Sequence, residues 1–214
     1  MSFGGEFMGL LRAIFPVTVG VTLASPVVAQ PDNRQLEIYI VRHAEKVRTG
    51  DAAIDNNCEP GPSLTDAGFD RALALRGLFS EARLDGVFST NCRRTLQTGL
   101  LTASDQTAEG ERPVSSGETY QAMQIYEAPA VLASKLSEVS GRYLVIGHSN
   151  TVGAIIEALG TTYEGGPLAS RENDRLYKVR RTAEGDFIAE GPCSFGTPFE
   201  RPEEHELPSC EPVL

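Results

Sequence analysis

Positive charge is scarce in this sequence, which has 19 lysine and arginine residues against 29 aspartate and glutamate residues and a formal net charge of −10. Such a balance argues against nucleic acid and anionic membrane surfaces as partners, because both repel an acidic protein. Internal repeats of fixed period and long low-complexity stretches are absent as well. With 214 residues, 41% of them apolar, the chain is long enough for one α/β domain of ordinary size. Any anion site must therefore be a local island of positive charge.

Apolar stretches long enough to anchor the chain in a membrane are also absent. The apolar stretch at residues 13–24 follows Arg12, carries Pro16 and is followed by small residues up to Ala29. It falls short of the roughly 20 residues that a membrane helix needs, and the pattern is typical of a signal peptide, residues 1–29. No cysteine directly follows it, so no lipid anchor is expected. We expect an exported protein, periplasmic or secreted, with no stable membrane insertion after signal cleavage.

Cysteine is limited to four residues, a number that fits an exported protein with two disulfides. Four cysteines allow three pairings. Cys193 and Cys210 share the proline-rich segment 191–214, so a bond between them is the natural closure of that tail. Cys58 and Cys92 would then join the loop after the first strand to the turn after the second. The alternative is four reduced thiols in a cytosolic protein.

Hydrophobic patterns predict strands that alternate with helices. The predicted strands cover residues 36–41, 86–89, 142–146, 175–181 and 187–189. The predicted helices run from Ser63 or Thr65 to about Ser80, and over residues 93–103, 128–139 and 151–159. Loops are expected at 46–63 and 104–113, and little regular structure from Gly191 onward. The pattern indicates an α/β fold, a three-layer α/β/α sandwich with a mostly parallel central sheet.

Two arginines and two histidines stand where predicted strands end. Arg42 and His43 follow the first strand, Arg94 lies at a strand-to-helix junction, and His148 follows a later strand. Ligands of open α/β sheets bind beyond the carboxyl ends of the strands, so these four side chains are expected to meet there. Cationic guanidinium groups beside imidazoles favour a pocket for a phosphoryl group.

The motifs around these residues resemble those of the histidine phosphatase superfamily, which has the phosphoglycerate-mutase-like fold. The first is Val41-Arg42-His43-Ala44-Glu45-Lys46, which matches the family's Arg-His-Gly/Ala signature. The second is Phe88-Ser89-Thr90-Asn91-Cys92-Arg93-Arg94-Thr95-Leu96-Gln97-Thr98, and the third is Val145-Ile146-Gly147-His148-Ser149-Asn150-Thr151. Together with Asn173-Asp174-Arg175-Leu176-Tyr177 they are similar to the small exported bacterial branch. The resemblance covers roughly residues 36–182 and implies a histidine phosphatase domain at residues 30–190.

The resemblance implies a role for each of these side chains. His43 would attack phosphorus and become a phosphohistidine, which splits the hydrolysis into two easier transfers. Arg42 and Arg94 would bind the equatorial phosphoryl oxygens, with Arg94 preferred over the adjacent Arg93 by the family register. His148 would donate to the same oxygens and stabilise the charge that develops on them.

Other residues have less defined roles. Protonation of the leaving oxygen usually falls to a carboxyl group, and the resemblance favours Glu127, with Glu118 as the alternative. Some small members of the family manage without a dedicated carboxyl acid. Asn150 adds a hydrogen bond to the substrate or caps the helix that follows. Lys46 either extends the positive rim of the pocket or is solvated.

Rival functions fit the sequence less well. A serine nucleophile elbow at Ser149 would need glycine where Thr151 stands. A metal-dependent hydrolase could use His43, Glu45 and His148, but two arginines in the same pocket oppose a cation. A phosphomutase needs a cytosolic metabolite, which a signal peptide disfavours.

We therefore expect a phosphatase that needs neither metal nor cofactor and acts on a phosphorylated small molecule or a phosphoprotein, phosphohistidine included. The alternative is a non-catalytic phosphoryl-binding protein of the same fold.

Overall fold

The computed structural model describes residue 1 and residues 35–59, 61–106, 123–163, 168, 172–198 and 207–214. The chain divides into two units, Met1–Pro31 and Asp32–Leu214, and the fold described below belongs to the second. The predicted signal peptide lies, beyond Met1, outside the described residues. Among the helices that the structure describes, none has both the length and the apolar character to cross a membrane.

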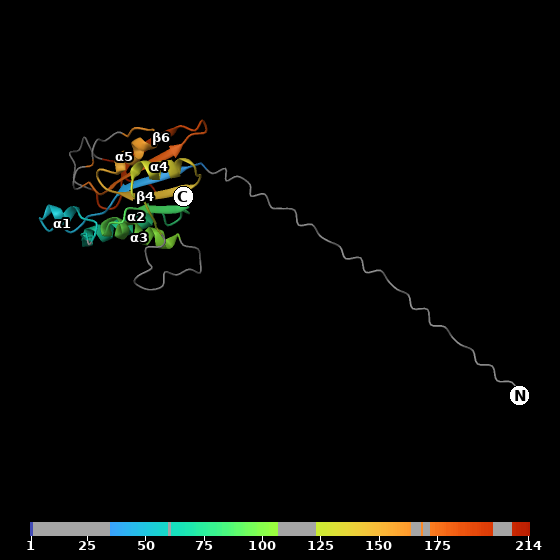
Figure 1. Ribbon diagram of the computed structural model, residues 1–214, viewed down its shortest axis with the longest axis horizontal. Coiled ribbons are helices and arrows are strands. Elements are labelled where there is room, and N and C mark those ends of the chain that lie inside the picture. Colours follow the sequence, from blue (N-terminus) through green and yellow to red (C-terminus); the bar gives the residue numbers. More distant parts are fainter. Residues whose placement is uncertain (2–34, 60, 107–122, 164–167, 169–171, 199–206) are drawn as a thin grey trace. The chain divides into compact units, whose positions relative to one another are not determined.

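The described residues form a six-stranded sheet in the order β3-β2-β4-β1-β5-β6 (Figure 1). The strands are β1 Glu37–Arg42, β2 Gly86–Ser89, β3 Gln124–Ile125, β4 Arg142–Gly147, β5 Arg175–Arg181 and β6 Phe187–Ser194. Strands β1, β2, β3 and β4 pair in parallel, whereas β5 runs antiparallel to β1 and β6 antiparallel to β5. The prediction of a mostly parallel sheet is confirmed, with an antiparallel pair at one edge.

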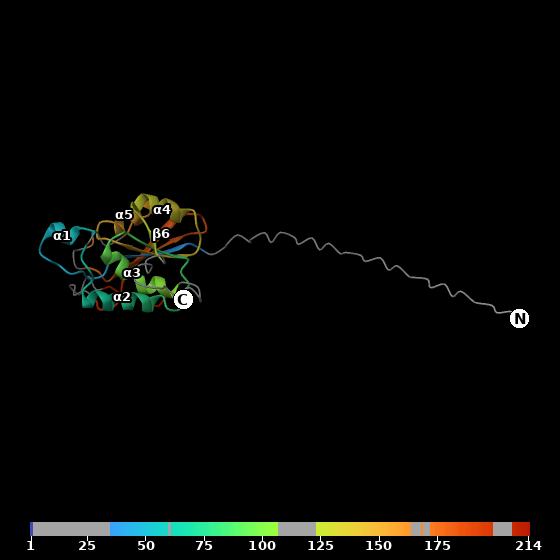
Figure 2. The same cartoon turned by 60° about the horizontal axis from the view of Figure 1, so that its bottom comes forward.

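Helices cover both faces of this sheet. They are α2 Asp66–Leu78, α3 Arg93–Asp105, α4 Pro129–Ser137 and α5 Val152–Ala158. The short helix α1 Ala52–Asn56 has no buried residue and does not cover the sheet. Successive side chains of a strand point to opposite faces, so Ile38 and Ile40 of β1 pack in one apolar cluster with α4 and α5. Tyr39 and Val41 pack in another with α2 and α3. Figure 2 shows these helix pairs on opposite sides of the sheet, which confirms the three-layer sandwich.

Local chemistry explains where the helices begin. The Thr65 side chain accepts a hydrogen bond from the Gly68 amide at 3.1 Å and caps α2, as the sequence indicated. Pro129 occupies the first turn of α4, where its missing N–H costs nothing. Full burial of Leu75 on the inner face of α2 contributes roughly 1.5–3 kcal/mol.

Three elements differ from the sequence prediction. The expected loop 46–63 contains α1, and the two-residue strand β3 was not predicted. The expectation of little regular structure from Gly191 onward is wrong for the first residues of that segment, because β6 continues to Ser194. Pro192 suggested a tail, but β6 is an edge strand, and a proline without an N–H is tolerated there.

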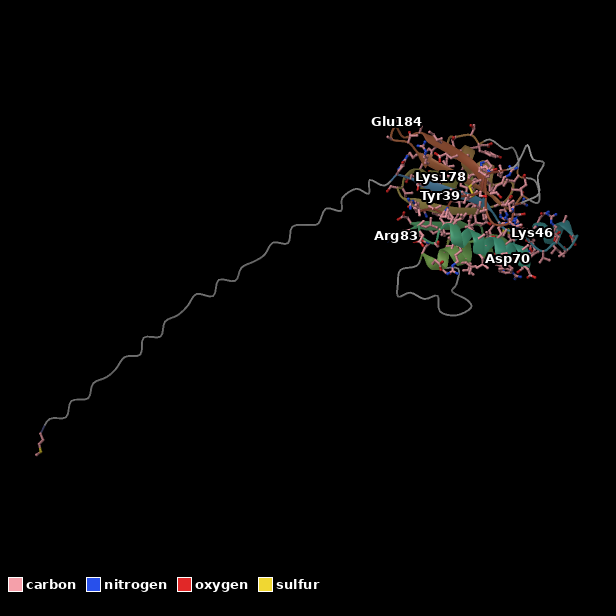
Figure 3. All side chains as sticks on the ribbon, turned by 180° about the vertical axis from the view of Figure 1, so that it is seen from behind. Tyr39, Lys46, Asp70, Arg83, Lys178 and Glu184 are labelled. Atoms are coloured by element: carbon pink, nitrogen blue, oxygen red, sulfur yellow. A yellow bond between two sulfur atoms is a disulfide. The ribbon has the colours of Figure 1, made fainter. Side chains whose placement is uncertain are left out.

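Both favoured disulfides are present, Cys58–Cys92 and Cys193–Cys210. The second attaches the C-terminal segment to β6, next to hydrogen bonds from the Ser194 amide to the Pro208 carbonyl (2.7 Å) and from the Cys210 amide to the Ser194 carbonyl (2.8 Å). The segment then reaches α2, where the Val213 amide donates to the Leu78 carbonyl. Next to this segment the Lys178 ammonium lies 5.6 Å from the centre of the Tyr39 ring, and Figure 3 labels these two residues beside each other.

Candidate active site

The two histidines leave the sheet from neighbouring parallel strands. Arg42, the last residue of β1, is in register with Gly147, the last residue of β4, and the His43 amide donates to the Gly147 carbonyl at 2.9 Å. The rings of His43 and His148 therefore lie side by side, with centroids 5.4 Å apart and planes inclined by 64°. The structure thus brings His43 and His148 together at the ends of two strands, as the sequence analysis expected.

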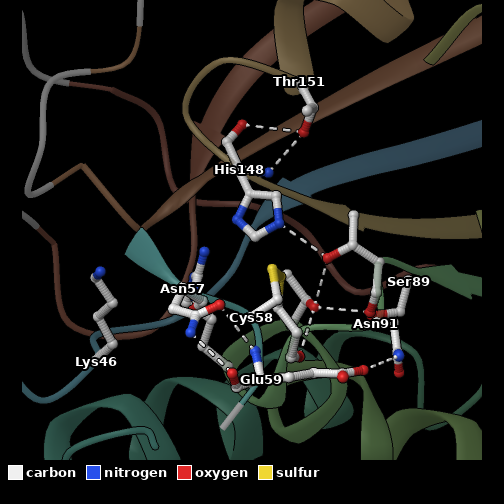
Figure 4. The surroundings of a disulfide bond; sticks show 12 residues. Lys46, Asn57, Cys58, Glu59, Ser89, Asn91, His148 and Thr151 are labelled. Atoms are coloured by element: carbon white, nitrogen blue, oxygen red, sulfur yellow. Dashed lines mark hydrogen bonds between the residues drawn. A yellow bond between two sulfur atoms is a disulfide. The ribbon is translucent and has the colours of Figure 1, made fainter. Parts of the chain in front are cut away.

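Gly147 permits this turn because a Cβ there would lie 2.6 Å from Oγ1 of Thr151. That hydroxyl accepts a hydrogen bond from the His148 amide at 2.7 Å and so fixes the backbone just after β4 (Figure 4). A side chain at position 147 would displace the hydroxyl and, with it, the His148 ring.

His43 is held as a neutral imidazole with its Nε2 lone pair available. It is 3% exposed, and Nδ1 lies 2.8 Å from the Ala44 carbonyl oxygen, which can only accept, so the proton is on Nδ1. Burial lowers the pKa of His43 well below its usual value, and the nearby charge of Arg42 lowers it further. Asn173 Nδ2 donates to the His43 carbonyl at 2.6 Å and Thr98 Oγ1 accepts from the Ala44 amide at 2.9 Å, so the backbone on both sides of the ring is fixed.

Hydroxyl groups set the tautomer of His148. Thr95 Oγ1 donates to the Cys92 carbonyl at 2.8 Å and accepts from Thr90 Oγ1, also 2.8 Å away. Thr90 Oγ1 has then used its proton and accepts from His148 Nε2–H at 2.8 Å. Nδ1 of His148 is therefore unprotonated; it is buried and has no hydrogen-bond partner among the described residues. Burial, followed by the charges of Arg94 and Arg42, lowers the pKa of His148 to about 4.

Two buried arginines complete the inner part of the site. Arg42 is 6% exposed, and burial, then the nearby charge of Arg48, lowers its pKa to about 10. Arg94 lies in the first turn of α3, equally buried, and its Nη1 donates to the Asn57 carbonyl at 2.9 Å. Arg93 is exposed, so of the two adjacent arginines it is Arg94 that faces the site.

These side chains line a cavity of about 690 Å³. Its described lining consists of Arg42, His43, Lys46, Arg48, Gly50, Ala52, Asp55, Asn56, Cys58, Arg94, His148, Ser149 and Asn150. Lys46 is thus part of the cavity wall rather than simply solvated, and Asn150 lies exposed at its edge. The lining residues that the sequence analysis predicted are cationic and polar, and such side chains bind a phosphoryl group.

The Cys58–Cys92 disulfide connects two walls of this cavity. Cys58 lines it, whereas Cys92 directly precedes α3, the helix that carries Arg94. Beside the disulfide, Asn91 Nδ2 donates to Glu59 Oε1 at 2.7 Å (Figure 4), in addition to the hydrogen bond from Arg94 to Asn57. The loop before α2 and the start of α3 are therefore joined next to Arg94 by the disulfide and these two hydrogen bonds, and further along by hydrogen bonds of Gln97 to Ser63 and Leu64.

Neither candidate acid is among the described residues that line this cavity. Glu127 is exposed beside Tyr126 and does not line the cavity, and Glu118 lies outside the described residues. Glu45, which the metal-dependent alternative required, is instead paired with Arg71 at 2.6 Å. In the described part of the chain, the cluster with metal-ligand spacing consists of Cys58, Cys92 and His148, and its two sulfur atoms are bonded to each other.

Three residues of the site were missed by the sequence analysis. Arg48 and Asp55 lie in the segment interpreted as a plain loop, and Asn173 was quoted only as part of the family resemblance. A local signal was present for α1, because the Asp51 side chain accepts from the Ala53 amide at 2.8 Å and caps this short helix. No pattern in the sequence indicated that Arg48 would reach the cavity.

Comparison with known proteins identifies the fold. No family model matches the chain, and no curated protein does. The protein histidine phosphatase SixA, solved with tungstate, superposes with a TM-score of 0.54 at 17% identity, over 74% of this chain and 97% of SixA. A protein from Escherichia coli str. K-12 substr. MG1655, provisionally assigned as an alpha-ribazole-5'-P phosphatase, gives a TM-score of 0.50 at 14% identity, over 73% and 95% of the two chains. The chain therefore has the fold of the histidine phosphatases, as the resemblance predicted.

Proposed function

We propose that this protein is a phosphohydrolase of the histidine phosphatase superfamily that acts on phosphomonoesters or phosphohistidine through a covalent phosphohistidine at His43. The observation that carries the proposal is the state of His43. Its proton is held on Nδ1 by the Ala44 carbonyl, and its depressed pKa keeps the ring neutral at pH 7, so Nε2 offers a lone pair beside two arginines. A neutral, fixed imidazole next to cationic donors is a nucleophile for phosphorus that needs no activating base.

The proposed reaction consists of two transfers at phosphorus. Nε2 of His43 forms a bond to phosphorus while the bond to the leaving oxygen breaks, and that oxygen takes a proton. Water then attacks the phosphohistidine, which releases inorganic phosphate and restores the imidazole. Arg42 and Arg94 lie on the cavity wall, where their planar guanidinium groups bind the equatorial oxygens through both transfers.

His148 contributes through a proton that it gains on binding. Before substrate binds, Nδ1 of His148 is unprotonated and can only accept, because Nε2–H is directed to Thr90. A phosphoryl dianion in the cavity raises the pKa of the ring, which takes up a proton and donates from Nδ1 to a phosphoryl oxygen. Asn150, at the edge of the cavity, supplies a further hydrogen bond to the substrate.

Glu127 is the proposed proton donor to the leaving oxygen, with Glu118 as the alternative. Tyr126, the residue before Glu127, is buried, and its hydroxyl donates to the Ile146 carbonyl at 3.4 Å next to the strand end that precedes His148. This contact supports a position of the Glu127 backbone near the site, although the Glu127 side chain is exposed. A substrate in the cavity would need to bring its leaving oxygen toward this side.

The fold neighbours support this chemistry. SixA is a protein histidine phosphatase and was solved with tungstate, a tetrahedral oxyanion like phosphate. The substrate assigned to the Escherichia coli protein, alpha-ribazole-5'-P, is a phosphate ester. The substrate of this chain is accordingly proposed to be a phosphorylated small molecule or a phosphoprotein, and the acidic charge of the chain disfavours nucleic acid.

Export is part of the proposal. Two disulfides fit an oxidising compartment such as the periplasm or the medium, and residues 1–29 have the pattern of a signal peptide. The mature protein would then comprise the domain at residues 30–190 and the tail at 191–214, which a disulfide holds to β6.

The second candidate function is phosphoryl binding without turnover. It is favoured by one observation: Asp55 is the one carboxylate among the described lining residues, and its Oδ1 accepts from the Thr49 amide and hydroxyl rather than facing a leaving group. A site with a nucleophile but no acid would bind phosphate esters and turn them over slowly.

Hydrolysis of an aryl phosphate in the presence of a chelator tests the two functions against each other. The matched variant is His43→Asn, because an asparagine amide can still donate to the Ala44 carbonyl while Nε2 is lost. The proposal predicts activity that survives chelation and falls about 10⁴-fold or more in the variant. Equal, residual activity in parent and variant would support the binding function, and activity lost on chelation would contradict a metal-independent mechanism.

A further inference from the structure

A buried arginine outside the cavity pairs with Glu45, close to the proposed nucleophile. Arg71 of α2 is 6% exposed, as buried as Arg42 and Arg94, yet it is not among the described residues that line the cavity. Its Nε donates to Glu45 Oε2 at 2.9 Å and its Nη2 donates to Glu45 Oε1 at 2.6 Å. Paired hydrogen bonds of this kind fix the position of a carboxylate as well as neutralising its charge. The reaction proposed above gives this buried pair no role.

The backbone of Glu45 is held by the same helix. Its carbonyl accepts from the amide of Thr65, the residue directly before α2, at 2.9 Å. A Cβ on Gly68 would lie 2.2 Å from the Glu45 carbonyl oxygen, so glycine allows α2 to pack directly against that carbonyl. Gly68 and Arg71 are three residues apart and therefore share one face of the helix. The first turns of α2 thus fix both the backbone and the side chain of Glu45.

The position of Glu45 determines where the Ala44 carbonyl lies. The Ala44 carbonyl and the Glu45 Cα belong to one planar peptide unit, so a displacement of Glu45 carries that carbonyl with it. The carbonyl oxygen lies 2.8 Å from Nδ1 of His43, where it holds the proton and leaves the lone pair on Nε2. If it moves away, the Nε2–H tautomer becomes populated, and this tautomer has no lone pair on Nε2 with which to attack phosphorus.

The segment after β6 supplies the remaining partners of Arg71. Nη1 donates to the Phe195 carbonyl at 2.7 Å, and Nη2 also donates to the Thr197 carbonyl at 2.9 Å. The guanidinium carbon lies 5.8 Å from the centre of the Phe195 ring. This segment lies beyond residues 36–182, over which the motifs resemble the histidine phosphatases. One guanidinium group therefore connects the C-terminal part of the chain to Glu45.

The same segment also reaches the nucleophile from its other side. The Phe195 amide donates to the Asp174 carbonyl at 2.9 Å, and the Ser194 hydroxyl donates to the Asp174 carboxylate at 2.7 Å. The neighbouring residue, Asn173, donates to the His43 carbonyl. These hydrogen bonds do not involve the C-terminal disulfide, so they hold the segment in its absence too. The nucleophile is thus supported by the segment on two sides.

We propose that Arg71 is a positioning residue for the nucleophile: acting through Glu45, it holds the Ala44 carbonyl against Nδ1 of His43 and joins the segment after β6 to the active site. The inference rests on the proposed function, because it takes His43 as the nucleophile. Arg71 does not line the cavity, so its effect is on the tautomer and position of the imidazole and not on the bound phosphoryl group.

Two readouts on Arg71→Met test the proposal. Methionine keeps much of the side-chain length and removes every donor. NMR of the imidazole nitrogens distinguishes the two neutral tautomers of His43 without any turnover; the parent should show Nδ1–H alone and the variant a mixture of both. In hydrolysis of an aryl phosphate, kcat should fall about tenfold while KM stays within about twofold, because the arginines that bind the phosphoryl group remain.

A double-mutant cycle tests whether Arg71 acts through Glu45. Glu45→Met alone should lower kcat about as much as Arg71→Met, and the double variant should lower it no further. Losses that multiply in the double variant would show that the two residues act independently and would refute the proposal.

Two further variants separate positioning from a loss of stability. Arg71→Lys keeps the charge beside Glu45 and serves if the methionine variant does not fold; one ammonium group cannot reach Glu45 and both carbonyls, so we expect the same mixed tautomers with about a threefold loss of kcat. The matched control is Arg142→Met, which breaks the pair of Arg142 Nε with Glu37 Oε2 (2.8 Å) at the opposite end of β1. This control should leave the tautomer and kcat as in the parent.

The outcomes separate this inference from the function on which it rests. If His43 keeps Nδ1–H alone in the Arg71 variants, if their kcat is unchanged, or if the control has the same effect, the positioning role is refuted and the phosphohydrolase proposal stands. If the tautomer changes as expected but the parent hydrolyses no phosphate ester, Arg71 positions His43 and the proposed function fails.

Discussion

Replacement of the Cys58–Cys92 pair by two serines should lower kcat/KM by more than the loss of stability alone explains. The disulfide joins the cavity wall at Cys58 to the start of the helix that carries Arg94. Without it, hydrogen bonds of Gln97 with Ser63 and Leu64 still hold the far end of the loop. Next to Cys58, the hydrogen bonds to α3 and its preceding turn that the described residues retain are those from Asn91 to Glu59 and from Arg94 Nη1 to the Asn57 carbonyl. Arg94 then samples orientations that no longer direct its donors to the phosphoryl position.

The second disulfide provides the control. The cysteines of the pair at the site are 34 residues apart and those of Cys193–Cys210 are 17 apart. Loop-closure entropy assigns about 4 kcal/mol to the first bond and about 3 kcal/mol to the second, so the two double-serine variants should be destabilised to a similar degree. The C-terminal disulfide attaches β6 to the tail and does not line the cavity.

The assay combines urea unfolding with steady-state hydrolysis of an aryl phosphate well below the unfolding transition. We expect the Cys58 and Cys92 double variant to lose about tenfold or more in kcat/KM, which corresponds to ~1.4 kcal/mol, a part of one charged hydrogen bond. The Cys193 and Cys210 double variant should stay within about twofold of the parent. Equal losses of kcat/KM in both variants, or none in the first, would refute the view that this disulfide positions Arg94.

Three further predictions concern the site. The pKa of His148 is about 4 in the folded protein against about 6.5 in the unfolded chain, so the unfolded chain binds more protons between these pH values. The free energy of unfolding should therefore fall as pH drops from ~6.5 to ~4, by about 3 kcal/mol from this residue. Denaturation of His148→Gln at both pH values should lack this part of the pH dependence, and an unchanged pH dependence would contradict the assignment. Arg94→Lys should lower kcat/KM about 10²-fold because lysine lacks the paired donors of the guanidinium group. The control Arg93→Lys changes an exposed residue and should keep kcat/KM near that of the parent. Equal effects of the two changes would show that the wrong arginine was chosen. Glu127→Gln should lower kcat about 10²-fold for an alkyl phosphate and far less for an aryl phosphate, whose leaving group needs no proton, and the same loss for both would remove Glu127 as the acid.

The inner site was predictable because it follows from a few local rules. Apolar, β-branched strands that end in Arg42-His43 and in Gly147-His148 place these residues at one edge of a parallel sheet, and the register of Arg42 with Gly147 confirms it. Arg94 was chosen over Arg93 by the resemblance alone, and its burial at the first turn of α3 agrees with that choice. The disulfide pairing followed from the position of Cys193 and Cys210 in one proline-rich tail, which left Cys58 and Cys92 as the other pair.

The part of the cavity wall formed by residues 46–63 could not be predicted because it depends on the path of a loop. Residues 46–63 show no periodicity, so nothing in the sequence indicated that the carboxylate of Asp55 would close a turn and bring Arg48 to the cavity wall. The two-residue strand β3 is below the length at which alternation can be recognised. Pro192 misled the prediction of the tail, since the tolerance of an edge strand for proline depends on sheet order, which sequence patterns do not specify.

The most direct test of the central claim is detection of the phosphorylated enzyme. The purified protein is mixed with an aryl phosphate, quenched within the first turnovers under alkaline denaturing conditions, and mapped by mass spectrometry of its peptides. The account predicts one acid-labile phosphoryl group on His43, absent from His43→Asn. A phosphoryl group on another side chain, or full turnover by the variant with no adduct on the parent, would contradict it.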